Sequence, residues 1–173
     1  MKDFLIIGNL NAVTYKEVFP LIKEGEVWVG CSPVAGSRWF EVPSDYSSKC
    51  SKVINGQKCI QIKSVWLTTL DYPKRHKPLQ LTAHYTPEAY PRYDNYDAIE
   101  VSRTEDIPCD YDGVMGVPIS FLDKYCPEQF EIVDAENQPE VGGARIYKRL
   151  IIRRFGACAQ VSNSTGSKRT DEY

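Results

Sequence analysis

The chain has 173 residues, of which 42% are apolar and 25% are charged, with a formal net charge of −2. This length and composition are typical of a compact domain with its own core, and no run approaches the roughly 20 apolar residues of a membrane-spanning helix. The apolar run over residues 4–7 is too short for a signal peptide. The sequence therefore predicts a cytoplasmic protein without a membrane partner.

Six cysteines are scattered along the chain, and none forms a Cys-x-x-Cys pair. A zinc site built from Cys31, Cys50 and Cys59 would need a fourth ligand and an unusual spacing. Free thiols in a reducing compartment are the better interpretation, so no metal site is predicted.

Charged residues are segregated in the second half of the chain. Between Glu105 and Glu136 there are nine acidic residues and one basic residue, whereas Arg145 to Arg154 contains five basic residues and no acidic one. Such a pattern is typical of a positive stripe that binds nucleic acid. It is equally typical of a solvated strand with basic outer positions, and both interpretations stay open.

The first 30 residues have the pattern strand, helix, strand. Residues 4–7 form a continuous apolar run, which predicts a parallel strand buried on both faces. A second strand is expected over residues 26–30. This order indicates an α/β domain.

The helix between these strands carries its own start and stop signals. Thr14 is a suitable N-cap with Glu17 three residues later, and Gly25 follows the last turn. Pro20 removes one hydrogen bond inside this span, which predicts a kink or two short pieces.

The chain becomes antiparallel in character after Cys31. Asn55-Gly56 is a strong signal for a tight hairpin, and the segments around it have β-rich composition. The expected strands cover residues 39–42, 52–54, 58–62 and 65–70.

The segment from residue 71 to 154 is richer in turns and tyrosines. A charged turn is expected at 71–78, an ordered tyrosine-rich loop at 84–97 and a turn-rich segment at 107–118. Short strands or helical turns are expected at 98–101, 121–125 and 130–133, followed by a closing strand at 145–154. The polar tail over residues 155–173 is expected to be disordered.

Several stretches of the sequence are similar to a known family. The longest are FLIIGNLNA (residues 4–12), which runs into YKEVFPLIK (15–23), and YDNYDAI (93–99), which is followed by IPCDYDGVMGVP (107–118) and FLDKY (121–125). LTTLDYPKR (67–75) and YKRLIIRR (147–154) belong with them. Together they resemble the EcoRI-type adenine-specific DNA methyltransferases. The resemblance covers roughly residues 2–154, and the tail has no counterpart that we recognise.

The resemblance implies a Rossmann-like methyltransferase sheet, S-adenosylmethionine as the methyl donor and adenine N6 in double-stranded DNA as the acceptor. The target base must leave the duplex to reach the donor. In this family an Asn-Pro-Pro-Phe motif holds the exocyclic amine, and neither that motif nor the glycine-rich donor loop occurs in this sequence. We therefore expect the carboxy-terminal portion of such an enzyme, inactive in methyl transfer by itself.

The expected fold class is α/β to α+β, with the last part of the Rossmann-like sheet joined to a mostly antiparallel, loop-rich target-recognition region. Residues 1–70 are expected to be the remnant of the core sheet, and residues 71–154 the DNA-contacting region. A sheet that starts at the first strand would expose an edge, which the missing amino-terminal half of the enzyme should cover.

Candidate base-pocket residues follow the first strand. Asn9 and Asn11 stand at its carboxy end, the edge where open α/β sheets bind ligands. Both residue types are also common in turns for local hydrogen bonds, and this second interpretation is favoured about two to one.

Candidate DNA contacts lie mainly after residue 70. The basic turn either offers cations to DNA phosphates or is simply a solvated turn. The tyrosines of the 84–97 loop either stack on unpaired bases or pack inside the loop. Asp110 and Asp112 offer carboxylates to cytosine N4 or hold a loop. An acid pair for hydrolysis is a weaker interpretation, and a metal site needs more oxygen ligands than this segment offers alone. The candidates are Lys74, Arg75, His76, Lys77, Tyr93, Asn95, Asp110, Tyr111, Arg149 and Arg153.

Three functions are weighed for the chain. The first is part of a site-specific DNA adenine-N6 methyltransferase of a restriction-modification system, contributing target recognition and part of the base pocket. The second is a non-catalytic DNA-binding module, and the third is a β-rich protein unrelated to DNA. Specific motifs spread over most of the chain favour the first.

Overall fold

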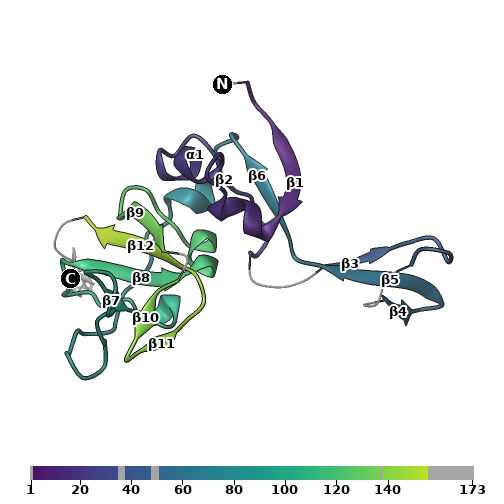
Figure 1. Ribbon diagram of the computed structural model, residues 1–173. Coiled ribbons are helices and arrows are strands. Elements are labelled where there is room, and N and C mark those ends of the chain that lie inside the picture. Colours follow the sequence, from purple (N-terminus) through teal and green to yellow (C-terminus); the bar gives the residue numbers. More distant parts are fainter. Residues whose placement is uncertain (1, 35–37, 48–50, 137, 156–173) are drawn as a thin grey trace, which may run out of the picture.

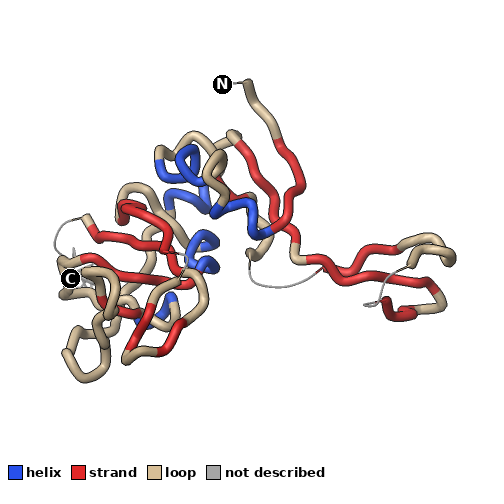
Figure 2. Tube along the Cα trace, in the orientation of Figure 1, coloured by secondary structure: helices blue, strands red, loops and turns tan. Residues whose placement is uncertain are grey.

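The computed structural model describes residues 2–34, 38–47, 51–136 and 138–155. Figure 1 shows three parts: a small sheet with a short helix near the amino terminus, a projecting arm of strands, and a larger body with the carboxy-terminal strands. Strands and loops dominate all three parts, and the helical segments are short (Figure 2). This mixed, sheet-rich structure is compatible with the expected α/β to α+β class. No helix in the described ranges is long and apolar enough to cross a membrane.

The first sheet has the strand order β1-β6-β2, and β6 runs antiparallel to both neighbours. Its strands are β1 (Leu5–Asn9), β2 (Trp28–Val29) and β6 (Ser64–Thr68). Because both outer strands oppose β6, β1 and β2 point in the same direction. The expected order of strand, helix and strand is confirmed, but an antiparallel strand lies between the two parallel ones.

The prediction that residues 4–7 form a parallel strand buried on both faces is wrong for the described residues. β1 pairs only with the antiparallel β6, which makes it an edge strand. Leu5, Ile6 and Ile7 are 53%, 51% and 54% exposed. Successive side chains of a strand point to opposite faces, so both faces of β1 are apolar and uncovered here.

The helical segment between β1 and β2 is divided, as Pro20 predicts. The 3₁₀ helix η1 spans Leu10–Thr14, and α1 spans Phe19–Lys23 with Pro20 in its first turn. Gly25 has a φ of +71° and follows α1 as the expected stop. Thr14 is not the N-cap of α1, because its hydroxyl donates to a carbonyl inside η1 and so closes that shorter helix.

The projecting part is an antiparallel sheet in the order β3-β5-β4, which together with Lys63 at its end we call the β arm (residues 38–47 and 51–63). Its strands are β3 (Arg38–Glu41), β4 (Ser51–Ile54) and β5 (Gln57–Ile62). The hairpin predicted at Asn55-Gly56 is confirmed, with φ values of +49° and +80° that a two-residue type I′ turn requires. Figure 1 shows the β arm extending away from the rest of the molecule.

The body is built on a four-stranded sheet in the order β7-β8-β12-β9, in which only β7 and β8 are parallel. Its strands are β7 (Ile99–Glu100), β8 (Val114–Pro118), β9 (Phe130–Glu136) and β12 (Arg149–Arg154). A hairpin lies beside it, formed by β10 (Glu140–Val141) and β11 (Ala144–Arg145). The connections contain the 3₁₀ helices η2 (Pro73–His76), η3 (Thr104–Asp106) and η4 (Ile119–Asp123).

Two predictions for the body need correction. The turn-rich segment at 107–118 ends in β8, which lies inside the sheet between β7 and β12. β8 tolerates Gly116 because the ring of Tyr93 occupies the space over that glycine. The closing strand expected over 145–154 is split into β11 and β12, which pair with different partners. Of the predicted tail, Phe155 is described, and residues 156–173 lie outside the described residues.

One core joins the first sheet to the body. The main cluster of buried apolar side chains includes Ile22 and Val65 from the first part and Met115, Phe121 and Ile152 from the body. It therefore takes residues from both sides of the boundary expected near residue 70. Burying each such side chain contributes about 1.5–3 kcal/mol, so this cluster is the main source of stability. The β arm adds no residue to it.

Candidate nucleic-acid interface

The basic turn expected to contact phosphates forms the helix η2, and its two lysines face solvent. Lys74 and Lys77 are exposed, and neither ammonium group has a hydrogen bond or ion pair within the described residues. Both line a surface hollow of about 310 Å³ together with Lys124 from the end of η4. Three ammonium groups around one hollow are suited to a phosphate.

Lys124 was missed by the sequence analysis because it lies far from the basic turn along the chain. Its ammonium group also donates to Glu105 at 2.6 Å, which partly neutralises it. Asp123 lines the same hollow, but its carboxylate accepts from the amide of Val34 at 2.6 Å. The single basic residue in the acidic stretch 105–136 was the available signal, but only the fold brings it to Lys74 and Lys77.

Arg75 turns inward and supports the fold instead of facing a ligand. Its guanidinium carbon lies 3.5 Å from the ring centroid of Trp28, a cation–π contact. It also lies 3.7 Å from Asp71 and donates to the carbonyl of Gly25 at 3.4 Å. The side chain is only 11% exposed, so Arg75 ties η2 to the segment between α1 and β2.

His76 lies between two carboxylates. Its Nδ1 is 2.6 Å from Glu128 and its Nε2 is 2.9 Å from Asp71. The hydrogen bonds to Glu128 and Asp71 raise the pKa of His76 above its usual value. The pKa of Glu128 is lowered to about 2, because the thiol of Cys126 and then His76 hydrogen-bond to its carboxylate. His76 is therefore neutralised by protein groups and is a weak partner for phosphate.

Tyr93 and Arg149 meet in the interior of the body. Nη2 of Arg149 lies 2.6 Å from Glu100, and its Nε lies 3.1 Å from both oxygens of the same carboxylate. The hydroxyl of Tyr93 donates to Glu100 as well. Burial, followed by this hydrogen bond to a carboxylate, raises the pKa of Tyr93 far above its usual value. Both side chains are mostly buried and bound to Glu100, and together they hold β7 against β12.

Asn95 also has an internal partner. Its amide nitrogen donates to the carbonyl of Gln138 at 2.8 Å, and its amide oxygen accepts from the backbone of Glu140 at 3.0 Å. Asp94 beside it accepts from the amide of Gly143 at 2.7 Å. These bonds fasten the tyrosine-rich loop to the hairpin of β10 and β11.

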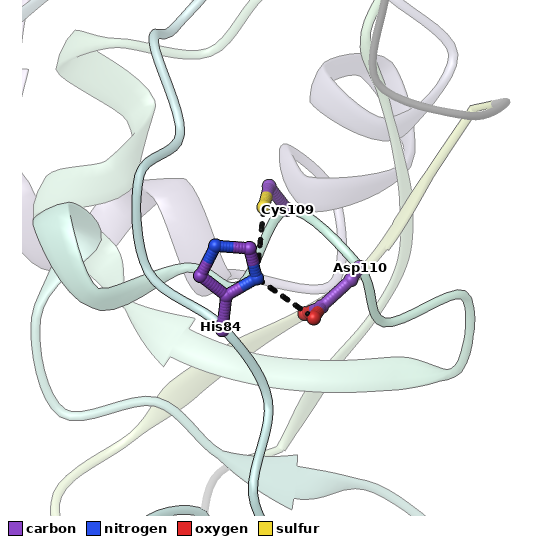
Figure 3. Close-up of side chains that lie close together, drawn as sticks. All are labelled: His84, Cys109 and Asp110. Carbon is purple, nitrogen blue, oxygen red and sulfur yellow. Dashed lines mark hydrogen bonds and ion pairs between the residues drawn. The ribbon is translucent and has the colours of Figure 1, made fainter.

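Asp110 belongs to a cluster with His84 and Cys109 (Figure 3). Nδ1 of His84 lies 2.9 Å from Oδ2 of Asp110 and 3.7 Å from Sγ of Cys109. The other oxygen of Asp110 accepts from the amide of Tyr85 at 2.8 Å. The hydrogen bonds from Tyr85 and then His84 lower the pKa of Asp110. Both oxygens of the predicted base contact are thus occupied within the protein.

Within the described residues, this cluster is the one group whose ligand atoms lie close enough to hold a metal ion, all within 4.8 Å. The same ring nitrogen of His84 faces both partners, whereas a Cys-His-Asp nucleophilic triad needs the two ring nitrogens to face different groups. Two of the three residues are exposed, and hydrogen bonds account for the arrangement. We assign the cluster to holding the segments 83–85 and 108–110 together.

Tyr111 packs beside this cluster. Its ring lies 4.6 Å from the ring of Tyr85, and the glycine at position 113 leaves space beneath it. Arg153, like Lys74 and Lys77, is accessible: its side chain is about half exposed, and within the described residues a single 3.7 Å contact with Glu131 holds it. A surface pair of this kind contributes about 0–1 kcal/mol, so Arg153 can exchange its partner for a phosphate.

The candidate base-pocket residues lie at the carboxy end of β1 and are both exposed. The side chain of Asn9 accepts from the amide of Asn11 at 2.9 Å and caps η1. This is the local turn role that the sequence analysis favoured. The side-chain amide of Asn11 has no hydrogen-bond partner within the described residues.

Comparison with known proteins shows the family to which the chain belongs. The model of the family described as adenine-specific methyltransferase EcoRI matches residues 1–171 of the chain. The chain belongs to the EcoRI-type adenine-specific methyltransferase family. The Type II methyltransferase M.EcoRI of Escherichia coli is 45% identical over 168 residues, which are 88% of this chain and 50% of that protein.

Two mycoplasma proteins are further relatives. The Type II methyltransferase M.MgeORF184P of Mycoplasma genitalium is 34% identical over 182 residues, 88% of this chain and 57% of that protein. M.MpnI of Mycoplasma pneumoniae is 36% identical over 146 residues, 80% of this chain and 46% of that protein. The chain thus spans about half the length of the curated relatives that it matches. No solved structure shows a significant match.

Membership of the EcoRI-type family extends over every described element, including the β arm. It also reaches beyond Arg154, where the sequence analysis recognised no counterpart, so that limit was wrong. Among the basic residues named as candidates after residue 70, Lys74, Lys77 and Arg153 have exposed side chains that no close ion pair holds within the described residues.

Proposed function

We propose that this chain is part of an S-adenosylmethionine-dependent methyltransferase that modifies adenine N6 in double-stranded DNA, within a restriction-modification system. The observation that carries the proposal is the 45% identity over 88% of the chain to a Type II methyltransferase. The chain contributes DNA contacts and one side of the base pocket. Methyl transfer requires the donor loop and the Asn-Pro-Pro-Phe motif, which these 173 residues do not contain.

The first sheet is proposed to be the last part of a Rossmann-like methyltransferase sheet. Its parallel strands β1 and β2 with an antiparallel strand between them suit a doubly wound sheet that carries an antiparallel member. The free edge of β1 and its apolar faces at Leu5, Ile6 and Ile7 need a further strand and a layer on each side. The partner that supplies them is the half of the enzyme that the relatives contain beyond the matched region.

The methyl donor is not assigned to the residues described here. A nucleotide-like donor needs a glycine-rich turn between a strand and a helix, with backbone amides facing the ligand. No strand in the described ranges is followed by such a turn: β1 leads through Asn9 directly into η1, and the segment after β2 leads into β3. S-adenosylmethionine is therefore proposed to bind outside these elements.

The proposed DNA surface combines the hollow at η2 with the carboxy edge of the first sheet. Lys74, Lys77 and Arg153 neutralise phosphates, and Asn9 and Asn11 line the entrance for the target base. The division into a core remnant (residues 1–70) and a DNA-contacting region (71–154) stays part of this proposal.

The test is reconstitution of activity from two polypeptides. The purified chain is mixed with the half of M.EcoRI that it does not match, labelled S-adenosylmethionine and DNA free of adenine methylation. N6-methyladenine is expected only when both polypeptides are present. Replacement of the motif asparagine by alanine in the M.EcoRI half provides the inactive control.

Two results contradict the proposal. Methylation by the chain alone shows that the motifs are dispensable. A stable complex of both polypeptides that binds DNA without methylating it, at any donor concentration, shows a non-catalytic DNA-binding module instead.

A further inference from the structure

The segment that contains the β arm has a net positive charge. Residues 38–63 contain five basic and two acidic residues, a net charge of +3, whereas the chain as a whole has −2 and the remainder therefore −5. The basic residues are Arg38, Lys49, Lys52, Lys58 and Lys63. A local excess of this kind, on a projecting element of an acidic chain, is the electrostatic pattern of a nucleic-acid contact.

Two of these cations support the β arm, and two face solvent. Arg38 donates to the carbonyls of Ser64 at 2.5 Å and Pro33 at 3.1 Å, which fixes the base of the β arm. Lys58 donates to two carbonyls in the loop after β3 at 2.7 and 2.9 Å. Lys52 and Lys63 are exposed, and no hydrogen bond or ion pair holds their ammonium groups within the described residues.

One face of the β arm carries polar and aromatic side chains suited to base edges. The register pairs Trp39 with Gln61, and it places Gln57 and Lys52 on the same face as this pair. All four side chains are exposed, and Glu41, Ile54 and the buried Cys59 share the face. A surface hollow of about 350 Å³ near the hairpin tip is lined by Gln57 and Lys52 together with Val53 and Lys58 of the opposite face. The opposite face holds mainly apolar residues.

The β arm begins at the edge of the sheet where a target base is expected. β1 and β2 run in the same direction, so their carboxy ends share one edge, where open α/β sheets bind ligands. Asn9 at the end of β1 pairs with Ser64, and the amide of Leu10 donates to the carbonyl of Lys63 at 3.1 Å. Figure 1 shows the β arm leaving the molecule from this place.

We propose that the β arm reads the DNA target, with the β4–β5 hairpin in the major groove and its polar face toward the bases. This inference rests on the proposed function. The major groove is about 12 Å wide and admits a two-stranded ribbon, and a glutamine can form two hydrogen bonds with adenine there. Gln57 and Gln61 contact base edges, while Lys52 and Lys63 contact phosphates. The main element of target recognition thus moves from residues 71–154 to the β arm.

Charge reversal on the β arm tests its contact with DNA. The double variant Lys52→Glu/Lys63→Glu is compared with Lys2→Glu/Lys16→Glu, which changes the net charge equally at exposed positions outside the β arm. Binding of the 173-residue chain to a labelled pool of random duplexes is measured by fluorescence anisotropy over a range of salt concentrations. The β-arm variant is expected to bind at least about tenfold more weakly, with a salt slope reduced by about two. The control is expected to change affinity less than about threefold.

A second variant tests base reading. Selection of bound duplexes from the random pool is repeated with Gln57→Ala. The preference at one adenine position is expected to be lost, while affinity for the unselected pool stays the same. Circular dichroism is used to check that each variant keeps the fold of the wild-type chain.

The possible outcomes distinguish a failure of the β-arm inference from a failure of the proposed function. If the wild-type chain binds DNA and both double variants bind equally well, the inference on the β arm is overturned while the proposed function stands. If the β-arm variant keeps DNA affinity but no longer associates with the unmatched half of M.EcoRI, the β arm is a protein contact and the inference is also overturned. If the wild-type chain binds no duplex even at low salt, the DNA-contact role in the proposed function fails as well.

Discussion

The first sheet and the carboxy-terminal body differ in how far their strands are buried. In the body, Ile151 and Ile152 on adjacent positions of β12 are both fully buried, because β8 and β9 flank the strand and other elements cover it. In the first sheet, Ile6 and Ile7 occupy equivalent adjacent positions of β1 and are both about half exposed. The same two-faced apolar pattern therefore belongs to a completed sheet in one place and to an open one in the other.

The largest effect is expected at the ion pair that joins β7 and β12 in the completed body. Arg149→Ala leaves Glu100 as a buried carboxylate without its counter-ion, which should lower the free energy of unfolding by about 3–5 kcal/mol. Urea denaturation measures this loss. Arg153→Ala, at the position four residues further along β12, is the matched control and should cost less than about 1 kcal/mol because its ion pair is half exposed. Equal losses would mean that the buried Arg149–Glu100 pair matters no more to stability than a surface ion pair.

Truncation of equivalent isoleucines compares the two regions directly. Ile152→Ala should lower the free energy of unfolding by about 2–5 kcal/mol, because it opens a cavity in the core. Ile7→Ala in the isolated chain should change it by less than about 0.5–1 kcal/mol, because the side chain is already half in water. If Ile7→Ala is as damaging as Ile152→Ala, the open state of β1 is refuted.

A single added methyl group tests the packing inside the body. Gly116→Ala places a Cβ against the phenol ring of Tyr93, so unfolding should become easier by about 1–3 kcal/mol. Gly8→Ala on β1 is the control, since its Cβ would meet Leu67 at an ordinary 3.6 Å. Thermal denaturation should show a lower Tm only for the first variant. An unchanged Tm for Gly116→Ala would show that Tyr93 moves freely.

The smallest effect is expected from the pH dependence of η2. The pKa of His76 is raised in the folded chain, so its stabilising contribution is full below the unfolded value near 6.5 and is lost as pH rises through the folded pKa. The pKa of Glu128 is lowered to about 2, so its contribution is present above about 4.3 and is lost as pH falls toward 2.

Urea midpoints measured between these limits test this behaviour. His76→Gln should remove the decline in stability above neutral pH, whereas the control His84→Gln should retain it. A decline of equal size in the His76→Gln variant would show that other groups cause it.

Local features of the fold were predictable from the sequence, and contacts between distant residues were not. Asn55-Gly56 and Gly25 were correctly placed because a positive φ depends on the residue itself. β8 was interpreted as turns because Gly116 and its neighbours suit a turn, while its strand depends on a tyrosine 23 positions earlier and on flanking strands. The limits of prediction thus follow the sequence separation of the contacts.

In the candidate site, too, contacts between distant residues could not be predicted from the sequence. Arg75 and Arg149 were proposed as DNA contacts from charge alone, but Trp28 and Glu100 engage them, and both partners lie more than forty residues away. Lys74 and Lys77 remain accessible because no acidic group of the described fold reaches them. Charge in the sequence shows how many cations exist, and only the tertiary structure shows which of them are neutralised.

Hydrogen–deuterium exchange of the backbone amides tests most directly that the first sheet is open and awaits the rest of a methyltransferase sheet. Amides of β1 in the chain alone should exchange much faster than those of β8 and β12, and the unmatched half of M.EcoRI should slow the exchange of β1 without changing β12. Amides of β1 that are already as protected as those of β12, or that remain fast in the presence of a bound partner half, would contradict this.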